Sequence, residues 1–167
     1  MKVERRKIDF SDGNAVIDDI QHLHHHGYRR AGNWNLTQIC QHLEKTMTGG
    51  MDGFGFRLPW ILRKTVIQWA FDRALKKRSL PAGAPTLKML RPADVDAAAG
   101  DADEDEAVIN ACIAAVRRAQ DFPGPMKDYP LLEDPPVDRW RDFMWIHAAH
   151  HLSFLVPRDA DDSGANS

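Results

Sequence analysis

The chain has 167 residues, of which 43% are hydrophobic and 28% are charged, and its formal net charge at pH 7 is -2. This length and composition are typical of one globular domain around one hydrophobic core. The nearly balanced charge gives no reason to expect a nucleic acid or an anionic membrane as a partner.

The placement of apolar and charged residues also bears on where the protein works. The first residues, MKVERRKIDF, are charged and lack the apolar run of a signal peptide. Charged side chains interrupt the most apolar stretch, 58–75, so we expect no membrane span. We therefore expect a cytoplasmic protein in which Cys40 and Cys112 are reduced and buried.

Helical periodicity, with apolar residues three and four apart, recurs along the chain. Ser11 or Asp12 is expected to cap the first helix, and Asn35 the second. Several glycines after the second helix predict a flexible loop over 49–55. In chain order, helices are expected over residues 14–26, 36–48, 59–78, 104–120 and 137–156.

Strand signals are poor, because β-branched residues are few and alternation of apolar and polar residues is short. The predicted fold class is all-α, a helical bundle with four core helices and one accessory helix. A long connection, 80–103, precedes the fourth helix. We expect one domain over residues 1–156 and a disordered acidic tail over 157–167.

The last predicted helix carries His147 and His151 in the middle of its apolar stripe. At ~100° per residue they lie roughly 40° apart, with Trp140 between them in angle. Two imidazoles one turn apart can bind one metal ion together. In the alternative interpretation they are core histidines, which would need several hydrogen-bond partners in an apolar seam. The pair alone leaves both interpretations open.

His42 is the natural third ligand, because it lies on the flank of the second helix's apolar stripe, beside Leu43. That position suits a side chain facing a cavity between helices. Without other information, a boundary histidine that hydrogen-bonds to solvent is the simpler interpretation.

The remaining histidines are less informative. Those of the cluster 22–26 lie in the last turn of the first helix, where the helix dipole favours positive charge, and we expect a surface cluster. His150 lies on the edge of the apolar stripe, as a pocket residue or a hydrogen-bond partner of a ligand. Glu44 and Asp52 are expected to be solvated charges, although Glu44 also suits a place beside a ligand. Motifs for a nucleophile elbow, a phosphate-binding loop, a dinucleotide site or a CxxC pair are absent from the sequence.

Two motifs carry a resemblance to a known superfamily. The segment NWNLTQICQHL, residues 33–43, is similar to the second-helix motif of the DinB/YfiT-like superfamily. The segment HAAHHLSFL, residues 147–155, is similar to its closing HxxxH motif. With the aromatic-rich region 54–60, these motifs most resemble a subgroup known only as a domain of unknown function. The resemblance covers about residues 5–157.

This resemblance implies an up-down-down-up four-helix bundle, with an accessory helix or a long crossover loop. It also implies that His42, His147 and His151 coordinate a divalent metal ion, most often zinc or nickel. Characterised relatives include transferases and isomerases that use low-molecular-weight thiols such as bacillithiol or mycothiol. One difference between this sequence and the superfamily concerns the expected substrate more than the expected metal ion. The segment 152–154, Leu-Ser-Phe, stands where the superfamily commonly has Arg-Gly-Gln.

Three hypotheses follow. The first is a metal-dependent transferase or hydrolase that acts on a small molecule, such as a low-molecular-weight thiol. The second is a non-catalytic, metal-stabilised binding or stress-response module, with the site closed by a fourth ligand such as His150 or Glu44. The third is a bundle whose histidines only pack. A homodimer formed through a shared apolar face is compatible with all three.

Overall fold

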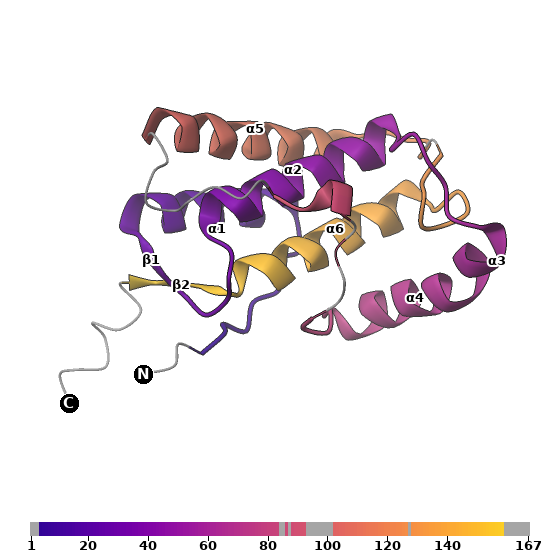
Figure 1. The fold of residues 1–167 in the computed structure, drawn as a ribbon, viewed down its shortest axis with the longest axis horizontal. Helices are drawn as coiled ribbons and strands as arrows, with labels where there is room; N and C mark the ends of the chain where they lie inside the picture. Colours follow the sequence, from indigo (N-terminus) through magenta and orange to yellow (C-terminus); the bar gives the residue numbers. More distant parts are fainter. Residues whose placement is uncertain (1–3, 84–85, 87, 93–101, 127, 159–167) are drawn as a thin grey trace.

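The computed structural model describes residues 4–83, 86, 88–92, 102–126 and 128–158, and these residues are mostly helical, as predicted (Figure 1). Within these ranges, no helix combines the length and the apolar character needed to cross a membrane. The helices are α1 Gly13–His26, α2 Leu36–Asp52, α3 Trp60–Leu62, the π-helical η1 Arg63–Ile67, α4 Gln68–Lys77, the short 3₁₀ helix η2 Lys88–Leu90, α5 Ala102–Asp121 and α6 Val137–Leu152. The strands are β1 Tyr28–Arg30 and β2 Leu155–Pro157.

The hydrophobic core lies between the four longest helices. Both α1 and α2 contact α5 on one side and α6 on the other (Figure 1). Each large apolar side chain removed from water contributes about 1.5–3 kcal/mol, so this shared core is the main source of stability. Its fully buried members include Ile20, Leu23, Ile39, Leu43, Met47, Trp140, Met144 and Leu152. Cys40 and Cys112 are free and buried among them, as predicted.

Side-chain caps fix the beginnings of the first two helices where the sequence predicts them. The Asp12 carboxylate accepts a hydrogen bond from the Ala15 N–H at 2.9 Å. Asn35 and Gln38 form a reciprocal capping box at the start of α2, in which each side chain accepts from the other residue's backbone N–H. Both caps satisfy backbone donors that a helix start leaves without partners.

The second helix is longer than predicted. It runs through Gly49 and Gly50 to Asp52 and ends at Gly53, so the predicted loop 49–55 begins too early. The reason is tertiary packing: a Cβ added at Gly50 would lie 2.8 Å from ring atoms of Trp140, which is fully buried on α6. Glycine lets the two helices approach here, and this contact outweighs the low helix propensity of the glycines.

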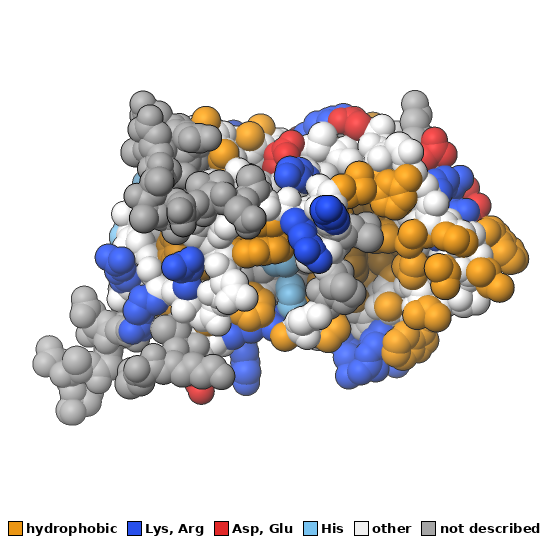
Figure 2. All heavy atoms as spheres, viewed as in Figure 1, with side chains coloured by type: hydrophobic (Ala, Val, Ile, Leu, Met, Phe, Trp, Pro, Cys, Tyr) orange, Lys and Arg blue, Asp and Glu red, His pale blue; other side chains and the backbone are white. Residues whose placement is uncertain are grey.

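The third predicted helix is divided into α3, η1 and α4. Arg63, at the start of the π-helical turn, is buried, ion-pairs with Glu133 and donates to the Leu58 carbonyl at 2.9 Å. Because Arg63 takes the inward position, most of the apolar residues around it face outward. The exposed large side chains of this segment are Trp60, Ile61, Leu62, Val66 and Trp69. Figure 2 shows hydrophobic side chains gathered at the end of the molecule that α3 and α4 occupy.

The last helix is shorter than predicted, and the chain after it forms a strand that the sequence does not predict. α6 ends at Leu152 instead of 156, and β2 pairs antiparallel with β1, with Tyr28 opposite Pro157. Three-residue strands are too short to show alternation of apolar and polar residues. The rest of the predicted tail, 159–167, lies outside the described residues, as does 93–101 of the long connection.

The close approach of α2 and α6 generates a prediction. Gly50→Ala is expected to lower the free energy of unfolding by about 1–3 kcal/mol, because the new methyl group must displace the fully buried Trp140 ring. Chemical denaturation measures the loss. Lys45→Ala, at an exposed position of the same helix, is the control and should change stability by less than about 0.5 kcal/mol. Equal stability of the Gly50 variant and the native protein would contradict this account.

Candidate metal centre

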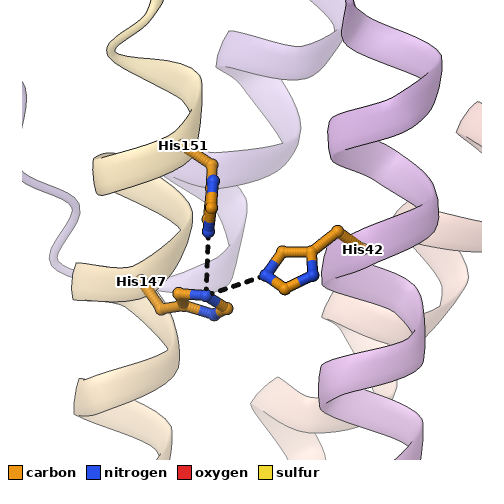
Figure 3. Close-up of side chains that lie close together, drawn as sticks. All are labelled: His42, His147 and His151. Atoms are coloured by element: carbon orange, nitrogen blue, oxygen red, sulfur yellow. Dashed lines mark hydrogen bonds between the residues drawn. The ribbon is translucent and has the colours of Figure 1, made fainter. Parts of the chain in front are cut away.

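Three histidines from two helices meet at one point between α2 and α6 (Figure 3). His42 comes from α2, and His147 and His151 come from successive turns of α6. One ring nitrogen of each lies within 4.8 Å of the other two. The Nε2 atom of His147 is 3.0 Å from Nε2 of His42 and 3.0 Å from Nε2 of His151. The prediction that these three imidazoles lie together is confirmed.

The backbone of η2 fixes the ring of His42. Its Nδ1–H donates to the Leu90 carbonyl oxygen at 2.7 Å. A carbonyl oxygen can only accept, so the proton must be on Nδ1 and the Nε2 lone pair faces the other two histidines. Histidines that bind a metal ion through one ring nitrogen typically donate the N–H of the other nitrogen to a carbonyl or carboxylate, which fixes the orientation of the ring. With 2% of its surface exposed, His42 is well buried, not a solvent-bonded boundary residue.

Hydrogen bonding alone does not satisfy the nitrogen atoms of this cluster. Nε2 of His147 has two imidazole nitrogens at 3.0 Å, but a neutral imidazole nitrogen carries either one proton or one lone pair. If Nε2 of His147 is protonated, its single proton must serve both His42 Nε2 and His151 Nε2 as acceptors. If Nε2 of His147 is unprotonated, its lone pair faces the lone pair of His42 Nε2. The other nitrogen of His147, Nδ1, is buried with no hydrogen-bond partner among the described residues.

The electrostatic surroundings keep all three imidazoles neutral. Burial lowers the pKa of His42, His147 and His151 from the ordinary value of 6.5. Unfavourable interactions with neighbouring histidines lower the pKa of His147 and His151 further. Neutral imidazole is the form that binds a metal ion, so the three lone pairs are available near neutral pH.

Aromatic rings pack around the histidines and limit their movement. The Trp34 ring stacks on His151 with centroids 5.2 Å apart, and it also contacts the His42 ring. Phe143 lies parallel to His147, with centroids 6.3 Å apart. These contacts hold the rings in orientations that point their Nε2 atoms toward one another.

One side of the site is open. Trp34, His150, His151 and Phe154 line a cavity of about 460 Å³, a size that suits a small molecule. Figure 2 shows histidine atoms reaching the surface on the face drawn. A molecule that enters this cavity therefore reaches the edge of the three-histidine cluster.

The other candidate ligands lie outside this cluster. His150 Nδ1 accepts from Arg5 at 3.3 Å, and Glu44 accepts from Thr48 at 3.1 Å. Asp52 pairs with Arg118. Within the described part of the chain, the only histidine, cysteine or carboxylate group with metal-binding spacing is the three-histidine set, so the 22–26 cluster does not form a second one.

The two thiols do not contribute to the site. Cys40 and Cys112 are fully buried in the core, and the hydrogen bond between them raises the pKa of Cys40 well above its ordinary value. A buried thiol with a raised pKa is a poor nucleophile and a poor ligand.

Three contributors to the site were not predicted from the sequence. The Leu90 carbonyl is a backbone group and gives no side-chain signal. Arg5 is far from the histidines in sequence. Trp34 did have a signal, since it is an aromatic residue directly before the cap of the helix that carries His42.

Comparison with known proteins gives one match. The family model described as a protein of unknown function (DUF1569) matches residues 2–158. Neither the curated proteins nor the solved structures include a match to the chain.

The hydrogen bond to Leu90 predicts the tautomer of His42. In the metal-free protein at neutral pH, ¹⁵N NMR is expected to show His42 protonated at Nδ1. The exposed His24 and His25 provide the comparison, because neither ring is fixed by a backbone carbonyl of the described residues. A resonance showing the proton of His42 on Nε2 would contradict the arrangement described here.

Proposed function

We propose that this chain, which belongs to the DUF1569 family of proteins of unknown function, is a metal-dependent enzyme that acts on a small molecule. In this proposal His42, His147 and His151 hold one divalent ion, most readily zinc or nickel. The reaction is transfer of a low-molecular-weight thiol to an electrophile or hydrolysis of a small substrate.

One observation carries the proposal: two imidazole nitrogens lie 3.0 Å from the Nε2 atom of a third. Ligand nitrogens about 2.0–2.1 Å from a shared ion lie roughly 3.0–3.4 Å apart. A cation between the rings would accept all three lone pairs, which hydrogen bonding within the cluster cannot do. The donor set therefore fits a divalent transition metal.

The ligand count favours catalysis over a purely structural role. Among the residues that the structure describes, no fourth histidine, cysteine or carboxylate joins the set. Three protein ligands with a free position are typical of catalytic sites, whereas structural sites are closed by four. A bound divalent ion supplies Lewis-acid chemistry, which lowers the pKa of a water or thiol beside it. The protein's own groups orient the ligand rings and admit a substrate through the cavity beside Trp34 and His151.

Helix directions support the finer proposal of a DinB-like up-down-down-up bundle. The Gly13 N–H donates to Gln120 at 2.6 Å, so the start of α1 lies at the end of α5. The Asp52–Arg118 ion pair joins the ends of α2 and α5, which are parallel. The start of α2 lies at the end of α6, where the histidines meet. We propose on this basis that the family belongs to the DinB/YfiT-like superfamily.

Metal analysis tests the ligand set. The purified native protein is expected to bind about one divalent ion per chain, and His147→Ala should weaken that binding more than about 100-fold, since it removes the central ligand. His25→Ala changes an exposed histidine outside the site and should bind like the native protein. Equal metal affinity in the His147 variant would exclude the proposed site.

An activity assay tests the enzymatic part of the proposal. The metal-loaded protein is expected to accelerate the reaction of a small thiol with an electrophilic acceptor, or the hydrolysis of a small ester or amide. His151→Ala should lower that rate at least about 100-fold, with His25→Ala as the control. If cobalt-substituted protein instead shows a closed four-ligand site and no turnover, the non-catalytic module is the better description.

A further inference from the structure

A second cavity lies beside the one that opens on the histidines. Its volume is about 490 Å³, and the two cavities share His150 as a lining residue. Its walls come mainly from the N-terminal segment, 5–9, from 78–80 and from α6. A ligand in the cavity beside His151 therefore has this second cavity as its neighbour, on the other side of the His150 ring.

The guanidinium of Arg5 lies at the boundary between these cavities. It donates from Nε to Ser153 Oγ at 2.6 Å and from one terminal nitrogen to His150 Nδ1 at 3.3 Å. Its central carbon lies 4.6 Å from the centre of the Phe154 ring. The Ser153 hydroxyl is buried and donates in turn to the His150 carbonyl at 2.6 Å. Three contacts thus hold the cation in one orientation next to His150.

The charge balance of this pocket leaves Arg5 without a carboxylate. Arg6 pairs with Asp19 at 2.8 Å, and Arg78 pairs with Asp9 and Asp142. Over the described ranges, neither Arg5 nor Lys7 has an acidic partner. The same cavity thus holds two cations that no carboxylate of the described residues neutralises.

Arg5 supplies the positive charge at the boundary between the two cavities, and Lys7 lines the same pocket.

We propose that Arg5 binds a carboxylate of the substrate whose reacting end lies at the three histidines. A guanidinium recognises a carboxylate through two parallel, charge-assisted hydrogen bonds, and one such contact fixes the direction of a bound molecule. Arg5 is held beside the cavity that reaches His151, so a molecule anchored there extends toward the histidines. This inference rests on the proposed function, and it narrows the substrate class to small thiols or other nucleophiles that carry a carboxylate several atoms from the reacting atom.

Matched pairs of thiols test the inference by binding alone. The probes are ω-mercapto carboxylic acids of three, six and eight carbons, each compared with the ω-mercapto alcohol of the same length. Cobalt-substituted protein is titrated with each probe, and the change in the cobalt absorption spectrum gives the dissociation constant. At least one acid is expected to bind about five- to tenfold more tightly than its alcohol.

The variants assign that preference to Arg5. Arg5→Gln should bind the acid and the alcohol equally, and Arg5→Lys should retain part of the preference because it keeps the charge but not the planar fork. Arg73→Gln removes an exposed cation of α4, which does not line the pocket, and should behave like the native protein. Binding of the alcohols should be the same in all four proteins, which also shows that the variants are folded.

The outcomes separate this inference from the function on which it rests. If no thiol of either kind changes the cobalt spectrum, the thiol-dependent form of the proposed function fails, and the inference about Arg5 fails with it. If acids and alcohols of every length bind equally, or if the preference survives in Arg5→Gln, the site binds thiols but the role of Arg5 is overturned.

Discussion

The site depends on one constraint: the Nε2 atom of His147 has two other imidazole nitrogens at 3.0 Å, in a largely buried place between α2 and α6. No arrangement of single protons satisfies all three nitrogens, because Leu90 already fixes the tautomer of His42. Buried polar groups without partners are costly, and the low local dielectric increases that cost. A cation at this point turns three competing lone pairs into three ligands, so the features that make the cluster unfavourable alone make it favourable as a metal site.

The fold keeps this cluster from relaxing. α2 and α6 approach closely where Gly50 lies against Trp140, and the histidines lie between the same two helices nearer the start of α2. Trp34 and Phe143 pack on the rings from outside. A polar cluster in a loosely packed interior would separate or admit water. Here the helix contact, the aromatic rings and the caps of α1 and α2 hold the three ring nitrogens close together, which would reduce the cost of assembling a metal site.

Sequence patterns predicted the parts of this structure that repeat with a helical period or have a specific cap. The starts of the first two helices, the all-α class and the convergence of three histidines are examples. Features set by contacts between distant segments were not predicted. The continuation of α2 through Gly50 depends on a ring from another helix, and in the divided third helix the buried Arg63 pairs with Glu133 from a distant segment. Leu90 contributes only its backbone, which no side-chain pattern can reveal.

The N-terminal segment shows how a local charge can matter when the overall charge does not. The net charge of -2 gives no reason to expect a nucleic acid or an anionic membrane as a partner. Arg5 and Lys7 nevertheless place positive charge beside the candidate site, and neither has an acidic partner among the described residues. The segment is held there because the Arg6 N–H donates to the Ser153 carbonyl at 2.9 Å. Ser153 and Phe154, which directly follow α6, both contact Arg5. The end of the helix that carries two of the three histidines therefore also holds a cation from the N-terminal segment. The position of this single charge, and not the charge summed over the chain, determines which small molecules the candidate site favours.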